Sequence, residues 1–131
     1  MSEDRPIKQF SRPLSPRISI YRLHPETLAS GAHRLSGVVL ILFVPFYLWM
    51  LYGMTGSPED FQDSLAMMHT SLGRIALWTA GTAFIYHFFS GIRMLCLDAG
   101  WGESRSMMRL SSQIMLGVAA VTAVILGVAL W

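Results

Sequence analysis

The chain has 131 residues, of which 53% are hydrophobic and only 14% are charged. Soluble domains average about 25% charged residues, so this composition excludes an ordinary soluble domain and indicates a membrane protein. The formal net charge is +2. Because membrane topology accounts for where the basic residues fall, we expect no nucleic-acid partner.

We expect residues 1–24 to form an extended segment on the cytoplasmic side of the membrane. Two prolines in Arg12-Pro13-Leu14-Ser15-Pro16 disfavour helix there. The segment either lies over a partner's surface or is a solvated tail. No signal peptide is recognisable, and the early acidic residues Glu3 and Asp4 do not suit a transit peptide. We therefore expect the chain to begin as translated, in a bacterial plasma membrane, with a mature organellar protein as the open alternative.

Three apolar stretches, at about 35–52, 75–97 and 114–131, each approach the ~20 residues that cross a bilayer. They predict an all-α membrane protein whose residues 25–131 form a three-helix transmembrane anchor. We place the helices at about 26–55, 69–98 and 106–131. Pro45 falls inside the first helix and predicts a kink there. The polar connection 57–69 allows a helical turn over 59–68.

The charges predict the orientation of these spans. Basic residues precede the first span and lie between the second and third, whereas the connection between the first and second spans carries Glu59, Asp60 and Asp63. By the positive-inside rule, the N-terminus and the second connection are cytoplasmic. The C-terminal Trp131 then lies on the opposite face.

The most informative side chain is His87, which lies within the second span. If that span ends near Asp98, His87 is roughly 15 Å inside the membrane. An ionisable residue at that depth usually marks a functional site, and imidazole often holds haem iron. Gly91 falls on the same helix face and leaves room for a large flat group, with Tyr86 beside it. The alternative is a neutral histidine hydrogen-bonded to a neighbouring helix.

A second histidine ligand is not expected from this chain. By counting along the helices, we place His33 about 10 Å shallower than His87, and His24 and His69 lie outside the core. No other histidine of the chain is therefore predicted to face His87 at its depth. The second ligand would come from another subunit, unless the iron is five-coordinate or no haem is bound.

A polar group at the start of the first span is the second candidate site. Ser30, His33, Arg34 and Gly37 fall within two helical turns and largely on one side. Their donors suit the carbonyl oxygens of a quinone or the propionates of a haem. Alternatively, Arg34 reaches lipid phosphate and Ser30 caps the helix. Arg93, near the end of the second span, could pair with a propionate, with Asp98 or with lipid phosphate.

Four motifs in this order carry a resemblance to a known family. They are Arg12-Pro13-Leu14-Ser15-Pro16, Ile20-Tyr21, Ser30-x-x-His33-Arg34-x-Ser36-Gly37, and His87-x-x-x-Gly91-Ile92-Arg93 with Asp98. From about residue 11 to 131, the chain resembles the cytochrome b subunit of succinate dehydrogenase. That subunit is a membrane anchor of respiratory complex II, succinate:quinone oxidoreductase.

The resemblance implies roles for particular residues. His87 matches the axial ligand of haem b, whose other histidine belongs to a second membrane-anchor subunit bundled with this chain. Ser30 and Arg34 match the quinone-binding residues, and His33 matches a neighbour of a haem propionate. We then expect Tyr86 and Gly91 to shape the haem pocket, with Arg34, His33 and Arg93 near its propionates.

The resemblance also implies partners. FAD and iron–sulfur clusters would lie in a flavoprotein subunit and an iron–sulfur subunit docked on the cytoplasmic face, so this chain alone would hold no complete active site. It departs from many relatives at Met94 and Arg17, where they carry histidine. A quinol:fumarate reductase anchor and a haem-free scaffold remain alternatives. A transporter is disfavoured because no ionisable residue follows Arg109.

Overall fold

The computed structural model describes residues 24–131, which form four α-helices joined by short connections. The helices are α1 (Pro25–Met54), α2 (Pro58–Met68), α3 (Ser71–Asp98) and α4 (Arg105–Leu130). Helices α1, α3 and α4 are long and apolar enough to cross a membrane, with mean hydropathies of 2.1, 1.3 and 2.3 over their most apolar windows. The predicted all-α membrane fold with three spans is confirmed. The expectation of an extended segment, with Arg17, lies outside the described residues.

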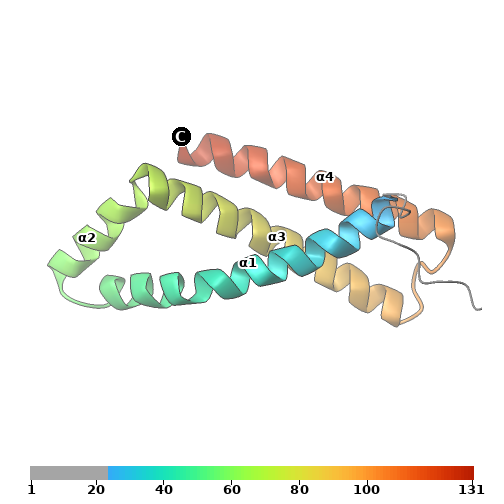
Figure 1. Ribbon diagram of the computed structural model, residues 1–131, viewed down its shortest axis with the longest axis horizontal. Coiled ribbons are helices and arrows are strands. Elements are labelled where there is room, and N and C mark those ends of the chain that lie inside the picture. The colour runs from blue at the N-terminus through green and yellow to red at the C-terminus, as the bar shows by residue number, and fades with distance from the viewer. Residues whose placement is uncertain (1–23) are drawn as a thin grey trace, which may run out of the picture.

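The three long helices alternate in direction along the bundle, and α1 crosses α3 obliquely (Figure 1). The start of α1 and the α3–α4 connection lie at one end of the bundle. The short helix α2 lies at the other end, toward which the chain's C-terminus also points. Arg34 in α1 and Arg105 at the start of α4 are therefore at the same end of the bundle. α1 continues as one helix through Pro45.

A proline and two hydroxyl side chains mark where the long helices begin. Pro25 occupies the first turn of α1, where its missing N–H costs no hydrogen bond. Thr70 caps α3 by accepting from the Gly73 N–H at 3.1 Å, and Ser104 caps α4. Gly100 and Gly102 have φ angles of +84° and +81°, which suit glycine, and they turn the chain between α3 and α4.

The helical segment expected over 59–68, in the connection after the first span, is found as the 11-residue helix α2. Its capping box joins Ser57 and Asp60. The Ser57 hydroxyl accepts from the Asp60 N–H at 3.2 Å, while the Ser57 N–H donates to Asp60 Oδ2 at 2.9 Å. Hydrogen bonds from the Ser57 side chain and backbone lower the pKa of the Asp60 carboxyl.

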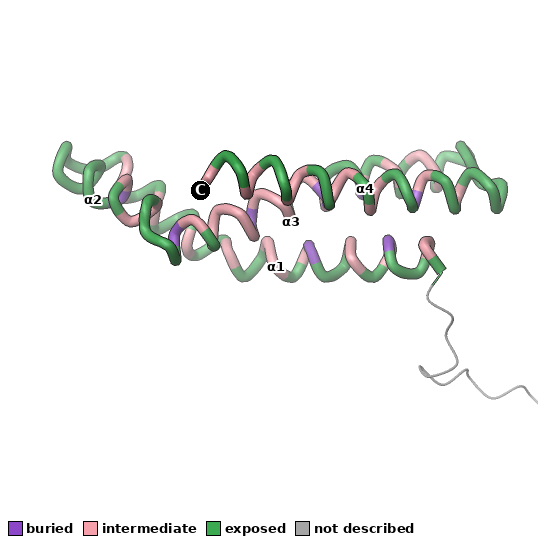
Figure 2. Tube along the Cα trace, turned by 90° about the horizontal axis from the view of Figure 1, so that it is seen from above, coloured by how far each residue is buried: buried purple, intermediate pink, exposed green. Residues whose placement is uncertain are grey.

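Helix α3 is the central element because it bonds to both other spans. The Trp78 indole N–H donates to the Ala123 carbonyl of α4 at 2.7 Å, and the Tyr86 hydroxyl donates to the Ala29 carbonyl of α1 at 2.7 Å. The buried hydrophobic side chains among residues 24–131 are few, namely Ala29, Ala80 and Tyr86. Exposed residues run along α1 and α4, whereas most residues of α3 are intermediate or buried (Figure 2).

Candidate functional site

The oblique crossing of α1 over α3 brings two histidines together. The rings of His33 on α1 and His87 on α3 stack with centroids 4.2 Å apart and planes 7° from parallel. The prediction that no histidine of the chain faces His87 at its depth is therefore wrong. That prediction rested on depths counted along each helix as if the helices ran parallel. Their crossing instead places His33 directly against the His87 ring.

Two oxygens of α1 meet Nδ1 of His87. The His33 carbonyl oxygen lies 3.1 Å from Nδ1, and the Ser36 hydroxyl oxygen also lies 3.1 Å from it. A carbonyl can only accept, so Nδ1 carries the ring proton and donates it. The lone pair of the neutral ring is then on Nε2, for which no hydrogen bond is found among residues 24–131.

This arrangement fits the chemistry of one haem ligand. Histidines that ligate metals usually donate their other ring N–H to a carbonyl, a carboxylate or water, as His87 does here. His33 cannot be the opposite axial ligand in this arrangement, because it stacks face to face on the His87 ring instead of standing across an iron from it. In the described residues no group of three or more His, Cys, Asp or Glu could hold a metal ion, so a bare multi-ligand metal site is not formed there.

Glycines permit the close approach of the two helices at the histidines. A Cβ added to Gly37 would lie 3.1 Å from Cε1 of His87, which is tighter than ordinary contact. A Cβ on Gly91 would lie 3.7 Å from Nε2 of His33. The flat group against Gly91 is thus the imidazole of His33. That Nε2 is itself buried with no hydrogen-bond partner in the described part of the chain.

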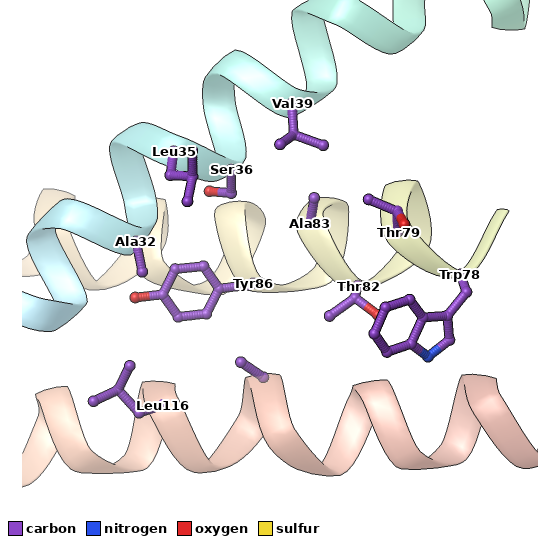
Figure 3. Close-up of a pocket in the computed structure, with 11 residues that line it drawn as sticks. Ala32, Leu35, Ser36, Val39, Trp78, Thr79, Thr82, Ala83, Tyr86 and Leu116 are labelled. Carbon is purple, nitrogen blue, oxygen red and sulfur yellow. The ribbon is translucent and has the colours of Figure 1, made fainter. Parts of the chain in front are cut away.

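Tyr86 is buried beside His87 in sequence, but its hydroxyl is used within the chain. It is only 4% exposed and donates to the Ala29 carbonyl, one residue before Ser30. The side chain points into the space between the three spans (Figure 3). Tyr86 therefore fixes α3 against the part of α1 that carries Ser30, His33 and Arg34.

Ser30 and Arg34 lie one helical turn apart on α1, so they share a face. Ser30 is half-buried and Arg34 is exposed. Within residues 24–131, the hydrogen bonds found involve neither side chain. Both donors are at the end of the bundle that holds the start of α1 and the α3–α4 connection.

Arg93 faces α4 and not Asp98. Its Nε donates to the Ser111 hydroxyl at 2.8 Å, and one terminal nitrogen donates to the Ser112 hydroxyl at 2.9 Å and the Met108 carbonyl at 3.3 Å. The other terminal nitrogen has only the Met94 sulfur at 3.9 Å. The suggested pairing with Asp98 is thus not formed, and most of the guanidinium ties α3 to α4.

A cavity of about 260 Å³ lies between α1, α3 and α4 (Figure 3). Its wall is almost entirely apolar, and the residues that line it include Ser36, Thr79, Thr82 and Tyr86. The Thr82 hydroxyl is buried with no partner among the described residues. The sequence reading missed both this cavity and the contact of Ser36 with His87. Their only sequence signal was a set of small hydroxyl residues inside apolar spans.

Comparison with known proteins gives a consistent family. Residues 8–126 match the family described as the succinate dehydrogenase/fumarate reductase transmembrane subunit. The succinate dehydrogenase cytochrome b556 subunit of Coxiella burnetii is 31% identical over 121 residues, covering 92% of this chain and 97% of that protein.

Two further relatives agree. The cytochrome b556 subunit of Paracoccus denitrificans is 31% identical over 91% of this chain and 92% of its own length. The cytochrome b560 subunit of Reclinomonas americana is 32% identical over 84% and 80%. With three apolar helices and a match over most of its length, the chain belongs to the family of transmembrane subunits of succinate dehydrogenase and fumarate reductase.

Proposed function

We propose that this chain is the cytochrome b membrane anchor of a succinate dehydrogenase and that His87 is an axial ligand of haem b. The observation that carries the proposal is the geometry of His87, whose Nδ1 proton is held by the His33 carbonyl. Nε2 is then the atom that would bind iron. The relatives named cytochrome b556 and b560 subunits support haem b as the group.

The second axial histidine would come from a second membrane-anchor subunit. His33 occupies the face of the His87 ring, so within this chain it does not supply that ligand. His33, Arg93, Tyr86 and Gly91 would instead shape the pocket. The buried Nε2 of His33, which has no partner among the described residues, and the terminal nitrogen of Arg93 that contacts the Met94 sulfur would donate to propionate oxygens.

Ser30 and Arg34 would bind the quinone. A guanidinium and a hydroxyl one turn apart can donate hydrogen bonds to a quinone carbonyl oxygen and polarise it while negative charge develops there. In the overall reaction, succinate loses two electrons and two protons, and the quinone gains two of each to become quinol. Oxidation would take place in the flavoprotein subunit on FAD, with electrons passing through the iron–sulfur subunit. Haem b, when bound, would supply a one-electron carrier held by His87.

The proposed location is the bacterial plasma membrane, with the start of α1 and the α3–α4 connection on the cytoplasmic side. Arg105 and Arg109 lie at the same end of the bundle as the start of α1. The acidic residues of α2 lie at the other end. This distribution follows the positive-inside rule and puts Ser30 and Arg34 on the side where the soluble subunits would dock.

The haem proposal is tested with His87→Ala in the complex purified from membranes. The variant should assemble but lose the haem b bands of the reduced-minus-oxidised spectrum, because the iron loses its nitrogen ligand. His69→Ala is the matched control, since His69 is exposed at the opposite end of the bundle. Unchanged haem bands in His87→Ala would rule out ligation by His87, whereas a parent complex with no haem bands would favour the haem-free scaffold.

The quinone proposal is tested separately with Arg34→Leu. Losing a charge-assisted hydrogen bond to the reacting oxygen should reduce quinone reduction by about 10²–10³-fold. Succinate oxidation by an artificial acceptor should persist. Arg74→Leu is the control and should leave both rates unchanged. Arg74 lies in the first turn of α3, at the end of the bundle opposite the start of α1. Equal loss of both activities in Arg34→Leu would show an assembly defect and contradict the quinone role.

A further inference from the structure

Ser36 is a buried hydroxyl that touches the proposed haem ligand from the neighbouring helix. It is 7% exposed and lies on α1, three residues after His33. Its oxygen lies 2.8 Å from the His33 carbonyl oxygen and 3.1 Å from Nδ1 of His87. The resemblance that assigns Ser30, His33 and Arg34 gives Ser36 no role.

The three atoms have a definite pattern of donation. Ser36 gives its single proton to the His33 carbonyl, so its lone pairs are left for another donor. The Nδ1 proton of His87 then lies between two acceptors, the carbonyl and the hydroxyl. Both acceptors come from the same turn of α1. Two acceptors restrict rotation of the ring more than one does.

A serine that bonds the carbonyl of the preceding turn is common in helices and needs no functional reason. What distinguishes Ser36 is the second contact, to a ring nitrogen on a different helix 51 residues away in sequence. That contact reaches the imidazole proposed to bind iron, whose Nε2 has no partner among residues 24–131.

We propose that Ser36 is a positioning residue for haem b, which orients His87 and increases the electron donation of its Nε2 through the Nδ1 proton. This inference rests on the proposed ligation by His87. Hydrogen-bond acceptors behind a ligating histidine make the ligand more basic, and their loss typically weakens metal binding by 10–100-fold. A more basic ligand favours ferric over ferrous iron, so Ser36 should lower the haem potential.

The test compares Ser36→Ala with Ser36→Thr in the intact complex. Alanine removes the hydroxyl, whereas threonine keeps it and adds one methyl group beside the cavity that Ser36 lines. Thr82→Val is the control, because it removes a buried hydroxyl that has no partner among the described residues. The readouts are the haem midpoint potential and the low-temperature electron paramagnetic resonance signal of the oxidised haem.

Ser36→Ala should weaken the ferric preference by about tenfold, which raises the potential by about 59 mV for one electron. Its resonance signal should also shift, while Ser36→Thr and Thr82→Val resemble the parent. If Ser36→Ala loses haem altogether, recovery of haem in Ser36→Thr supports the role of the hydroxyl.

A parent-like Ser36→Ala would overturn the inference, as would equal changes in the alanine and threonine variants, which would show a packing effect. These outcomes differ from failure of the proposed function. In that case His87→Ala would itself keep the haem bands.

Discussion

At the scale of single residues, His87 shows how a neighbouring helix can select the state of a side chain. The carbonyl of His33 fixes the proton on Nδ1, and the ring of His33 covers one face of the imidazole. Only the Nε2 edge is left without a hydrogen bond in the described chain. The proposed iron-binding atom is therefore Nε2.

Gly37 gives the first prediction at this scale. Gly37→Ala places a methyl 3.1 Å from Cε1 of His87, so the ring must move or the helices must separate. Overpacking of this kind typically costs about 1–3 kcal/mol. We expect a lower haem-to-protein ratio in the purified complex. Gly31→Ala, on the same helix with no atom within 4 Å, should keep the full ratio. An equal haem content in both variants would contradict the prediction.

The sequence allowed some of these residues to be predicted but not their partners. His87 stood out because an ionisable side chain is rare in an apolar span. Ser36 and Gly37 were visible as small residues, yet their contact with His87 depends on a separation of 51 residues along the chain. A residue pattern within one helix does not show which residue of another helix lies against it.

At the scale of elements, the crossing of α1 and α3 explains both a successful and a failed expectation. The three spans were predictable, because each needs a long apolar stretch and little else. The depth of His33 relative to His87 was not predictable, because it depends on the angle between two helices. Tyr86 helps to set that crossing through its bond to the Ala29 carbonyl. Helix α2 falls on the residues where a helical turn was expected, and its Ser57–Asp60 capping box is readable in the sequence.

The prediction at this scale concerns the bond between α3 and α1. Tyr86→Phe removes a buried hydroxyl that donates to the Ala29 carbonyl at 2.7 Å. The complex should lose about 1 kcal/mol of stability, a typical net value for such a hydrogen bond. Thermal unfolding of the purified complex measures it. Tyr52→Phe is the control, because Tyr52 is 81% exposed near the end of α1. Identical unfolding midpoints for the two variants would show that the bond does not hold the helices.

At the scale of the whole molecule, the described chain buries too little to be stable as an isolated core. Its buried hydrophobic residues are Ala29, Ala80 and Tyr86, whereas large apolar side chains line the outside of α1 and α4. Lipid can cover these faces without penalty, and a second anchor subunit can do the same. The composition predicted this class of protein, but it could not predict which face a partner covers, since every outward face is similarly apolar.

The central claim is that His87 binds the iron of haem b through Nε2, opposite a histidine from a second subunit. The most direct measurement is a density map of the intact complex at a resolution that shows side chains. We expect a porphyrin whose iron lies against Nε2 of His87, while Nδ1 remains hydrogen-bonded to the His33 carbonyl and the Ser36 hydroxyl. A His87 ring that faces lipid, or a haem ligated by other residues, would contradict it.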